Sequence, residues 1–98
     1  MYFFLRTNNP RPTFSEDMTP AERERMAAHV AYWTERARER IAIVFGPVAD
    51  PAGAYGIAVC RAPDMEAIQR LVDADPAKGL LEYEITPMAA AVIGHEVQ

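Results

Sequence analysis

The chain has 98 residues, of which 50% are hydrophobic and 24% charged, and its formal net charge is −4. This length fits one small domain, so we expect a single domain over 1–98, with a core of about 1–88 and a tail at 89–98. The lone Cys60 excludes an intramolecular disulfide framework and favours a reducing, cytoplasmic location. The apolar start, Met1 to Leu5, is too short for a membrane span or a signal-peptide core, so no membrane partner is expected.

The basic residues do not predict a nucleic-acid partner. Arginines and glutamates alternate along one stretch of the chain, which contains Glu22, Arg23, Glu24, Arg25, Glu35, Arg36, Arg38, Glu39 and Arg40. A nearly balanced stretch in an acidic chain is no electrostatic footprint for a phosphate backbone. We interpret it as the solvated face of a helix with mixed charge pairs.

The first predicted elements are a short strand, a loop and the start of a helix. Tyr2 to Leu5 favour a strand, and residues 8–10, Asn-Asn-Pro, favour a turn that ends it and leads into a proline-bracketed loop. Thr19 is then predicted to be the N-cap of a helix, because Pro20 suits the first helical position and Glu22 completes a capping box.

This helix is predicted to run to about Glu39 and to be followed by a hairpin. Its buried stripe is predicted from apolar residues at helical spacing, namely Met26, Val30, Trp33 and Ala37. The continuous apolar run 41–45, closed by Gly46-Pro47, predicts a strand with both faces covered. Turn residues at 50–53 and an apolar run at 55–60 predict the second strand of the hairpin.

The last predicted elements are a second helix and a final strand. The helix is expected to open at Pro63 without a strong cap, since Ala62 precedes it, and to end at 73–76. Its predicted buried stripe consists of Met65, Ile68, Leu71 and Val72. Alternation over 80–86 predicts a strand with Leu81, Tyr83 and Ile85 on one face and Glu82 and Glu84 on the other. In the tail, 89–93 is compatible with a helical turn or an edge strand.

The order strand, helix, strand, strand, helix, strand predicts a ferredoxin-like α+β fold, βαββαβ, with a four-stranded antiparallel sheet. Both helices are expected on one face of this sheet. The run 41–45 nevertheless offers apolar side chains to both faces. We therefore expect a homodimer in which the sheet of a second copy covers the free face.

Short segments in a fixed order carry a resemblance to a known family: Tyr2-Phe3-Phe4-Leu5, His29-Val30-Ala31-Tyr32-Trp33, Phe45-Gly46-Pro47-Val48, Asp50-Pro51 with Gly53, Asp75-Pro76 and Lys78-Gly79-Leu80. With these, the chain resembles the YCII-related family of dimeric α+β-barrel proteins from Tyr2 to about Met88. The loop over 10–19 resembles the branch of the family with a longer loop after the first strand. The stretch 76–80 is shorter than the family's usual loop.

The resemblance implies a dimeric α+β barrel whose pocket, between sheet and helices, carries a His–Asp pair. By motif, these residues are His29 and Asp75. The spacing along the helix places His29 at the border of the buried stripe. A carboxylate on one imidazole nitrogen can hold the tautomer in which the other nitrogen accepts a proton near neutral pH.

We therefore expect a cofactor-independent enzyme that catalyses lyase- or isomerase-type proton transfer on an aromatic or carbonyl compound. His29 would be the general acid/base and Asp75 its orienting partner, with no metal and no organic cofactor. The resemblance adds a dehydrochlorinase-like activity to the options. The alternative is a non-catalytic small-molecule binding or sensing dimer. Equally open is a structural reading, in which His29 only bonds a backbone carbonyl and Asp75 only ends a helix.

Three further residues are candidates for substrate binding. Tyr32 and Trp33 could line an aromatic pocket, and Arg11 could hold a substrate carboxylate through its planar guanidinium. Trp33 also fits a core position, and Arg11 also fits a solvent-exposed loop. Tyr83 and Cys60 are expected to pack in the sheet. Neither a metal-ligand spacing nor a glycine-rich phosphate loop is found, and no residue supports a cofactor-free monooxygenase.

Overall fold

A four-stranded antiparallel sheet is the framework of the computed structural model, which describes residues 1–97. Its strands are β1 (Tyr2–Asn8), β2 (Ala42–Val48), β3 (Tyr55–Arg61) and β4 (Glu82–Pro87), in the order β2-β3-β1-β4. β1 lies between β3 and β4, while β2 and β3 form the predicted hairpin.

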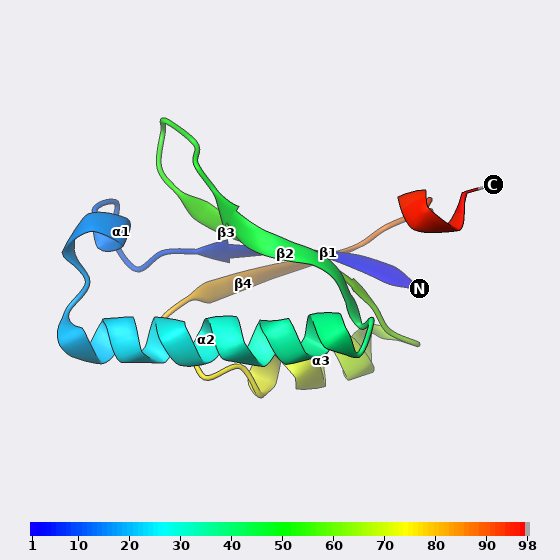
Figure 1. Ribbon diagram of the computed structural model, residues 1–98, viewed down its shortest axis with the longest axis horizontal. Helices are drawn as coiled ribbons and strands as arrows, with labels where there is room; N and C mark the ends of the chain where they lie inside the picture. Colours follow the sequence, from blue (N-terminus) through cyan, green and yellow to red (C-terminus); the bar gives the residue numbers. More distant parts are fainter. Residues whose placement is uncertain (98) are drawn as a thin grey trace.

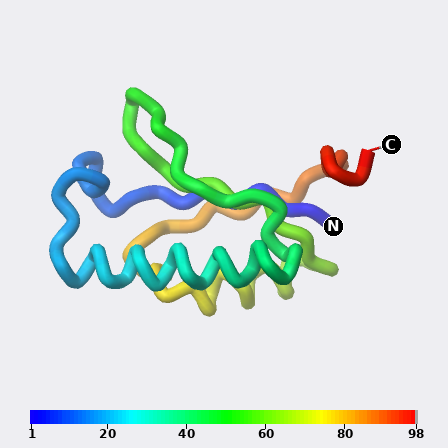
Figure 2. The backbone as a smooth tube through the Cα atoms, in the orientation of Figure 1, coloured from blue at the N-terminus to red at the C-terminus, as the bar shows by residue number. Residues whose placement is uncertain are grey.

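Helices α2 (Pro20–Arg38) and α3 (Met65–Asp73) pack on the same face of this sheet (Figure 1). Together with the strand order, this confirms the ferredoxin-like α+β fold. A short helix, α1 (Phe14–Asp17), precedes α2, and a 3₁₀ turn, η1 (Gly94–Glu96), follows β4. The start of β1 and the η1 turn lie at the end of the molecule opposite α1 (Figure 2).

The start of α2 has the predicted capping box. The Glu22 amide donates to Thr19 Oγ1 at 3.1 Å, and the Thr19 amide donates to Glu22 Oε1 at 2.8 Å. The helix ends at Arg38, as expected, and Arg40 then adopts a left-handed φ of 61° that turns the chain toward β2. The prediction that Val30 is buried in this stripe is wrong, because Val30 is 51% exposed.

Two strands extend beyond their predicted ends. β1 continues to Asn8, since its polar end pairs with both β3 and β4. β2 contains Gly46 and Pro47, so the prediction that these residues close the strand is wrong. An edge strand tolerates proline because one side of its backbone needs no ladder donor, and Pro47 pairs with Gly56 there.

The second helix is better capped than its sequence suggested. α3 begins at Met65, and the side chain of Asp64 caps it by accepting the Ala67 amide at 2.8 Å. The predicted start at Pro63 without a strong cap is therefore wrong. Met65 was also expected in the buried stripe, but it is exposed in the first turn of the helix, away from the core.

The core lies between the sheet and the two long helices. Its buried members are Phe3, Leu5, Trp33, Ala42, Ala58, Cys60, Ala62, Ile68 and Val72. A smaller cluster of Phe14, Ala77 and Leu81 joins α1 to the segment that follows α3. The predicted loop over 10–19 therefore contains a short helix, which is anchored by the buried ring of Phe14.

The free face of the sheet has an apolar centre. Phe4 and Val44 are 38% and 50% exposed there, and Val59 on β3 lies between them in the register. The expectation that β2 has both faces covered does not hold within one chain, because only one face meets helices. In the tail, 89–93 forms neither a helix nor a strand. No helix among residues 1–97 has the length and apolarity needed to cross a bilayer.

The cap of α3 leads to a stability prediction. Replacing Asp64 with Ala removes the acceptor for the Ala67 amide, and we expect the free energy of unfolding to fall by about 1 kcal/mol. Asp64→Asn keeps an acceptor oxygen and should retain most of the stability. Urea denaturation of the three proteins measures the difference, and equal stabilities for Asp64→Ala and the original chain would contradict the cap.

Candidate active site

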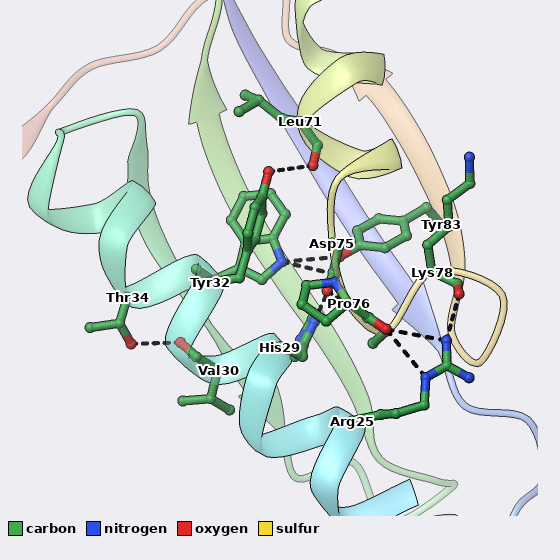
Figure 3. Close-up of polar contacts among 12 residues, drawn as sticks. Arg25, His29, Val30, Tyr32, Thr34, Leu71, Asp75, Pro76, Lys78 and Tyr83 are labelled. Carbon is green, nitrogen blue, oxygen red and sulfur yellow. Dashed lines mark hydrogen bonds and ion pairs between the residues drawn. The ribbon is translucent and has the colours of Figure 1, made fainter.

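Helix α2 presents three side chains, one turn apart, toward the segment that follows α3. Arg25, His29 and Trp33 recur every four residues and so share one face of the helix. The facing segment begins at Asp75, which is buried although it is charged. Figure 3 shows His29, Arg25 and Asp75 converging from these two parts of the chain.

The Asp75 carboxylate is the centre of this contact. His29 Nδ1 lies 2.7 Å from Asp75 Oδ2, and Trp33 Nε1 donates to the same oxygen at 3.1 Å. The Tyr83 hydroxyl also donates to Oδ2, and the Ala77 amide donates to Oδ1 at 2.9 Å. The side chain of Asp75 is 0% exposed and that of His29 is 14% exposed. Every donor therefore reaches the carboxylate from inside the protein.

The short segment after Asp75 is held against α2 by Arg25. Its guanidinium donates to the Pro76 carbonyl from Nε and Nη2, both at 3.2 Å, and to the Lys78 carbonyl from Nη2 at 2.7 Å. Gly79 adopts a φ of 89°, which permits the sharp turn toward β4. The shortened stretch 76–80 thus leaves Asp75 in contact with His29.

The surroundings of Asp75 keep it ionised. Burial alone would raise the pKa of this carboxyl, but the hydrogen bonds from His29, Tyr83, the Ala77 amide and Trp33 together lower the pKa to about 2. Burial and the neighbouring Asp75 raise the pKa of Tyr83, so its hydroxyl stays a donor. An ionised carboxylate can only accept, so Nδ1 of His29 carries the proton in this pair.

A cavity of about 190 Å³ opens beside His29, between α2, α1 and the β2–β3 hairpin. His29, Trp33 and Tyr83 line it, and no residue among 1–97 hydrogen-bonds the second imidazole nitrogen, Nε2. Its walls are largely apolar: Leu5, Phe14, Met18, Met26, Val30, Phe45, Pro47, Ile57, Ala58 and Leu81. An imidazole thus lies in the wall of a mostly apolar cavity, as is common in sites for small molecules.

The predicted site residues are only partly brought together. His29 and Trp33 line the cavity, with Asp75 directly behind them. Tyr32 is directed elsewhere: its hydroxyl donates to the Leu71 carbonyl at 2.6 Å, and it is not among the cavity residues in the described chain.

Arg11 lies outside the cavity as well. Its guanidinium forms a pair of 2.8 Å hydrogen bonds with the Glu22 carboxylate, and its Nε donates to Asp17 Oδ1 at 2.8 Å. Arg11 therefore fastens α1 to the start of α2. Its predicted role toward a substrate carboxylate has no support in this geometry.

Sequence reasoning missed Tyr83 as part of the site. It was expected to pack in the sheet, and it does face the helices, but its hydroxyl also completes the Asp75 environment. The available signal was the inward face of the final strand, because a buried tyrosine hydroxyl needs a hydrogen-bond partner. Cys60 packs in the core as predicted, and burial raises the pKa of its thiol to about 12. Over residues 1–97, no group of three or more potential metal ligands is assembled.

Comparison with known proteins relates the chain to one family and to two solved structures. The family model described as "YCII-related domain" matches residues 2–89. No curated protein sequence matches the chain. Two solved structures are similar to it in fold.

The first of these structures is 5-chloro-2-hydroxyhydroquinone dehydrochlorinase (TftG) from Burkholderia phenoliruptrix AC1100, in complex with 2,5-dihydroxybenzoquinone. It aligns with a TM-score of 0.69 and 16% identity over 93% of this chain and 96% of its own. The second is muconolactone isomerase, with a TM-score of 0.72 and 18% identity over 100% of this chain and 98% of its own. At these identities the likeness establishes the shared fold.

The ionised Asp75 predicts a specific loss of stability in acid. In the folded protein the pKa of Asp75 is about 2, below its ordinary value of 3.8. Ionised Asp75 therefore contributes fully to the free energy of unfolding above about pH 4, and this contribution disappears as the pH falls through about 2. The difference amounts to about 2 kcal/mol of unfolding free energy. Urea denaturation between pH 6 and pH 2 should show this loss in the original chain and not in Asp75→Asn.

Asp73→Asn is the matched control for this measurement. Asp73 is exposed and bonds Lys78 and Gln69, so its replacement leaves the Asp75 contacts in place. This variant should keep the full acid-dependent loss assigned to Asp75. Parallel pH profiles for Asp75→Asn and the original chain would contradict the assignment.

Proposed function

This chain belongs to the YCII-related domain family, and from that membership and the site geometry we propose that it is a small-molecule enzyme that transfers a proton through His29. The observation that carries the proposal is the 2.7 Å hydrogen bond between His29 Nδ1 and the buried carboxylate of Asp75, at the wall of an apolar cavity. Its substrate would be a small aromatic or carbonyl compound.

The pair supplies a base that is oriented before a ligand binds. With Nδ1 protonated and bonded to Asp75, the lone pair of His29 is on Nε2. When Nε2 takes a proton from the ligand, the resulting imidazolium is stabilised by the ionised Asp75. Asp75 therefore acts through His29, as the residue that positions it and balances its charge.

Two classes of reaction fit this arrangement. In an elimination, His29 removes a proton, the C–H electron pair becomes the new double bond, and the leaving group departs as an anion. In an isomerisation, His29 returns the proton to another carbon of the same ligand. Both reactions balance without an external electron acceptor or a cofactor. The two structural neighbours are named for a dehydrochlorination and an isomerisation, which supports these two classes.

We also propose that the working unit is a homodimer formed through the sheet faces. The helices cover one face only, and the other has an apolar centre with Phe4 and Val44 exposed. The resemblance to the YCII-related family of dimeric α+β-barrel proteins supports a second copy as its cover. A cytoplasmic location, suggested by the single buried Cys60, stays part of the proposal.

The catalytic proposal is tested by a screen of chlorinated hydroxyaromatic compounds and lactones. We expect His29→Gln to lower kcat at least about 100-fold, because glutamine can still donate to Asp75 but cannot act as a base. Asp75→Asn should lower kcat less, since the base is retained but loses its orientation. His95→Gln is the control, since His95 lies in η1, outside the cavity.

Two results would reject the proposed chemistry. Turnover that survives both His29→Gln and Asp75→Asn would show that the pair does not carry the reaction. Ligands that raise the melting temperature without being converted would favour the alternative, a binding or sensing dimer with the same cavity.

The dimer leads to a prediction of mass. Light scattering at micromolar concentration should give the original chain twice its 10.9 kDa mass. Val59→Glu places a charge at the centre of the free sheet face and should give a single-chain mass, since an unpaired charge is costly to bury. Val92→Glu, in the exposed tail, is the control and should stay dimeric. A single-chain mass for the original protein would contradict the dimer.

A further inference from the structure

Thr7 is a buried polar residue in the cavity wall that the proposed proton transfer does not use. It lies on β1 and is only 8% exposed. Its register neighbours are Gly56 on β3 and Tyr83 on β4, and all three residues line the cavity. Figure 1 shows that α2 packs against the sheet that contains β1, so Thr7 lies on the sheet side of the cavity wall and His29 on the helix side.

The hydroxyl of Thr7 has no hydrogen-bond partner among residues 1–97. Buried hydroxyls are nearly always paired, so an unpaired one needs an explanation. In the described chain, no side-chain nitrogen or oxygen is both fully inaccessible and unpaired. The Thr7 hydroxyl is therefore still accessible, and the cavity is the space that it reaches.

Gly56 provides the room for this hydroxyl. A Cβ at Gly56 would collide with Thr7 Oγ1, so any other residue would displace the hydroxyl. The backbone of Gly56 is not in the left-handed region that requires glycine. Space for the Thr7 side chain is thus what glycine supplies at this position.

We propose that Thr7 is a substrate-binding residue, which hydrogen-bonds an oxygen of the ligand on the side opposite His29. This inference rests on the proposed function, which places the reacting end of the ligand beside His29. The ligand class is then a six-membered ring with oxygen substituents on opposite sides. The cavity volume of about 190 Å³ suits one such ring, since a cavity of about 150 Å³ holds benzene.

The walls of the cavity agree with this class of ligand. Phe14, Met18 and Phe45 present apolar surface for the faces and edges of a ring. The polar groups of the two opposing walls, His29 and Thr7, can then fix its orientation by one hydrogen bond each. A ring with one oxygen would leave the Thr7 hydroxyl unpaired and should bind less tightly.

The test compares 1,4-hydroquinone with 4-methylphenol, which has the same shape but a methyl group in place of one hydroxyl. Affinities come from NMR titrations of the full chain, with the indole signal of Trp33 as reporter, because Trp33 is the single tryptophan and lines the cavity. The original chain should prefer hydroquinone. Thr7→Val, which keeps the shape without the hydroxyl, should bind hydroquinone about three- to tenfold more weakly and 4-methylphenol no less tightly.

Two further variants keep the test decisive. Thr7→Ser retains the hydroxyl and should retain the preference for hydroquinone. Gly56→Ala should abolish the preference, since its Cβ displaces the Thr7 hydroxyl, and it replaces Thr7→Val if that variant does not fold. The inference is overturned if the original chain does not prefer hydroquinone, if the preference survives loss of the hydroxyl, or if both ligands weaken equally.

The result separates this inference from the proposed function. A Thr7-dependent preference without turnover of any compound would uphold the binding role and reject the chemistry. Turnover that depends on His29, with binding indifferent to Thr7, would uphold the chemistry and reject the binding role.

Discussion

A carboxylate that stays ionised inside the protein is the interaction on which this site depends. The side chain of Asp75 is fully buried, and burying a charge is costly unless donors surround it. Its donors come from α2, from β4 and from its own turn, namely His29, Trp33, Tyr83 and the Ala77 amide. Since α2, β4 and the turn each contribute at least one donor, assembly of the carboxylate environment also orients the imidazole of His29.

Helix α2 contributes both to the hydrophobic core and to the environment of Asp75, and Trp33 takes part in both. Its ring belongs to the main core, while its indole N–H donates to Asp75 at the edge of that core. One turn earlier is His29, and one turn before that Arg25 binds the carbonyls of the segment that carries Asp75. The histidine is thus held from both ends by contacts that also stabilise the fold, which limits its freedom to leave the cavity wall.

The rest of the cavity wall combines α1 with parts of the sheet and of α2. Within the sheet, the β2–β3 hairpin provides much of this wall, and α1 closes one side of the cavity. In this chain, α1 is fastened by Arg11 to Glu22 and by Phe14 to the cluster with Ala77 and Leu81. The two neighbours of the same fold are named for different reactions, so the shared fold alone does not decide the reaction.

The sequence by itself determined the order of the elements, the capping box of α2 and the alternation of β4, because these depend on local spacing and on residues close together in the chain. It also singled out His29 and Asp75, through the family resemblance. Only the tertiary structure decided that Tyr83 and Trp33 share the same carboxylate oxygen, that Arg11 is committed to Glu22, and that Gly56 makes room for Thr7. These contacts join residues on different elements, and their partners depend on strand register and helix packing, which no local pattern specifies.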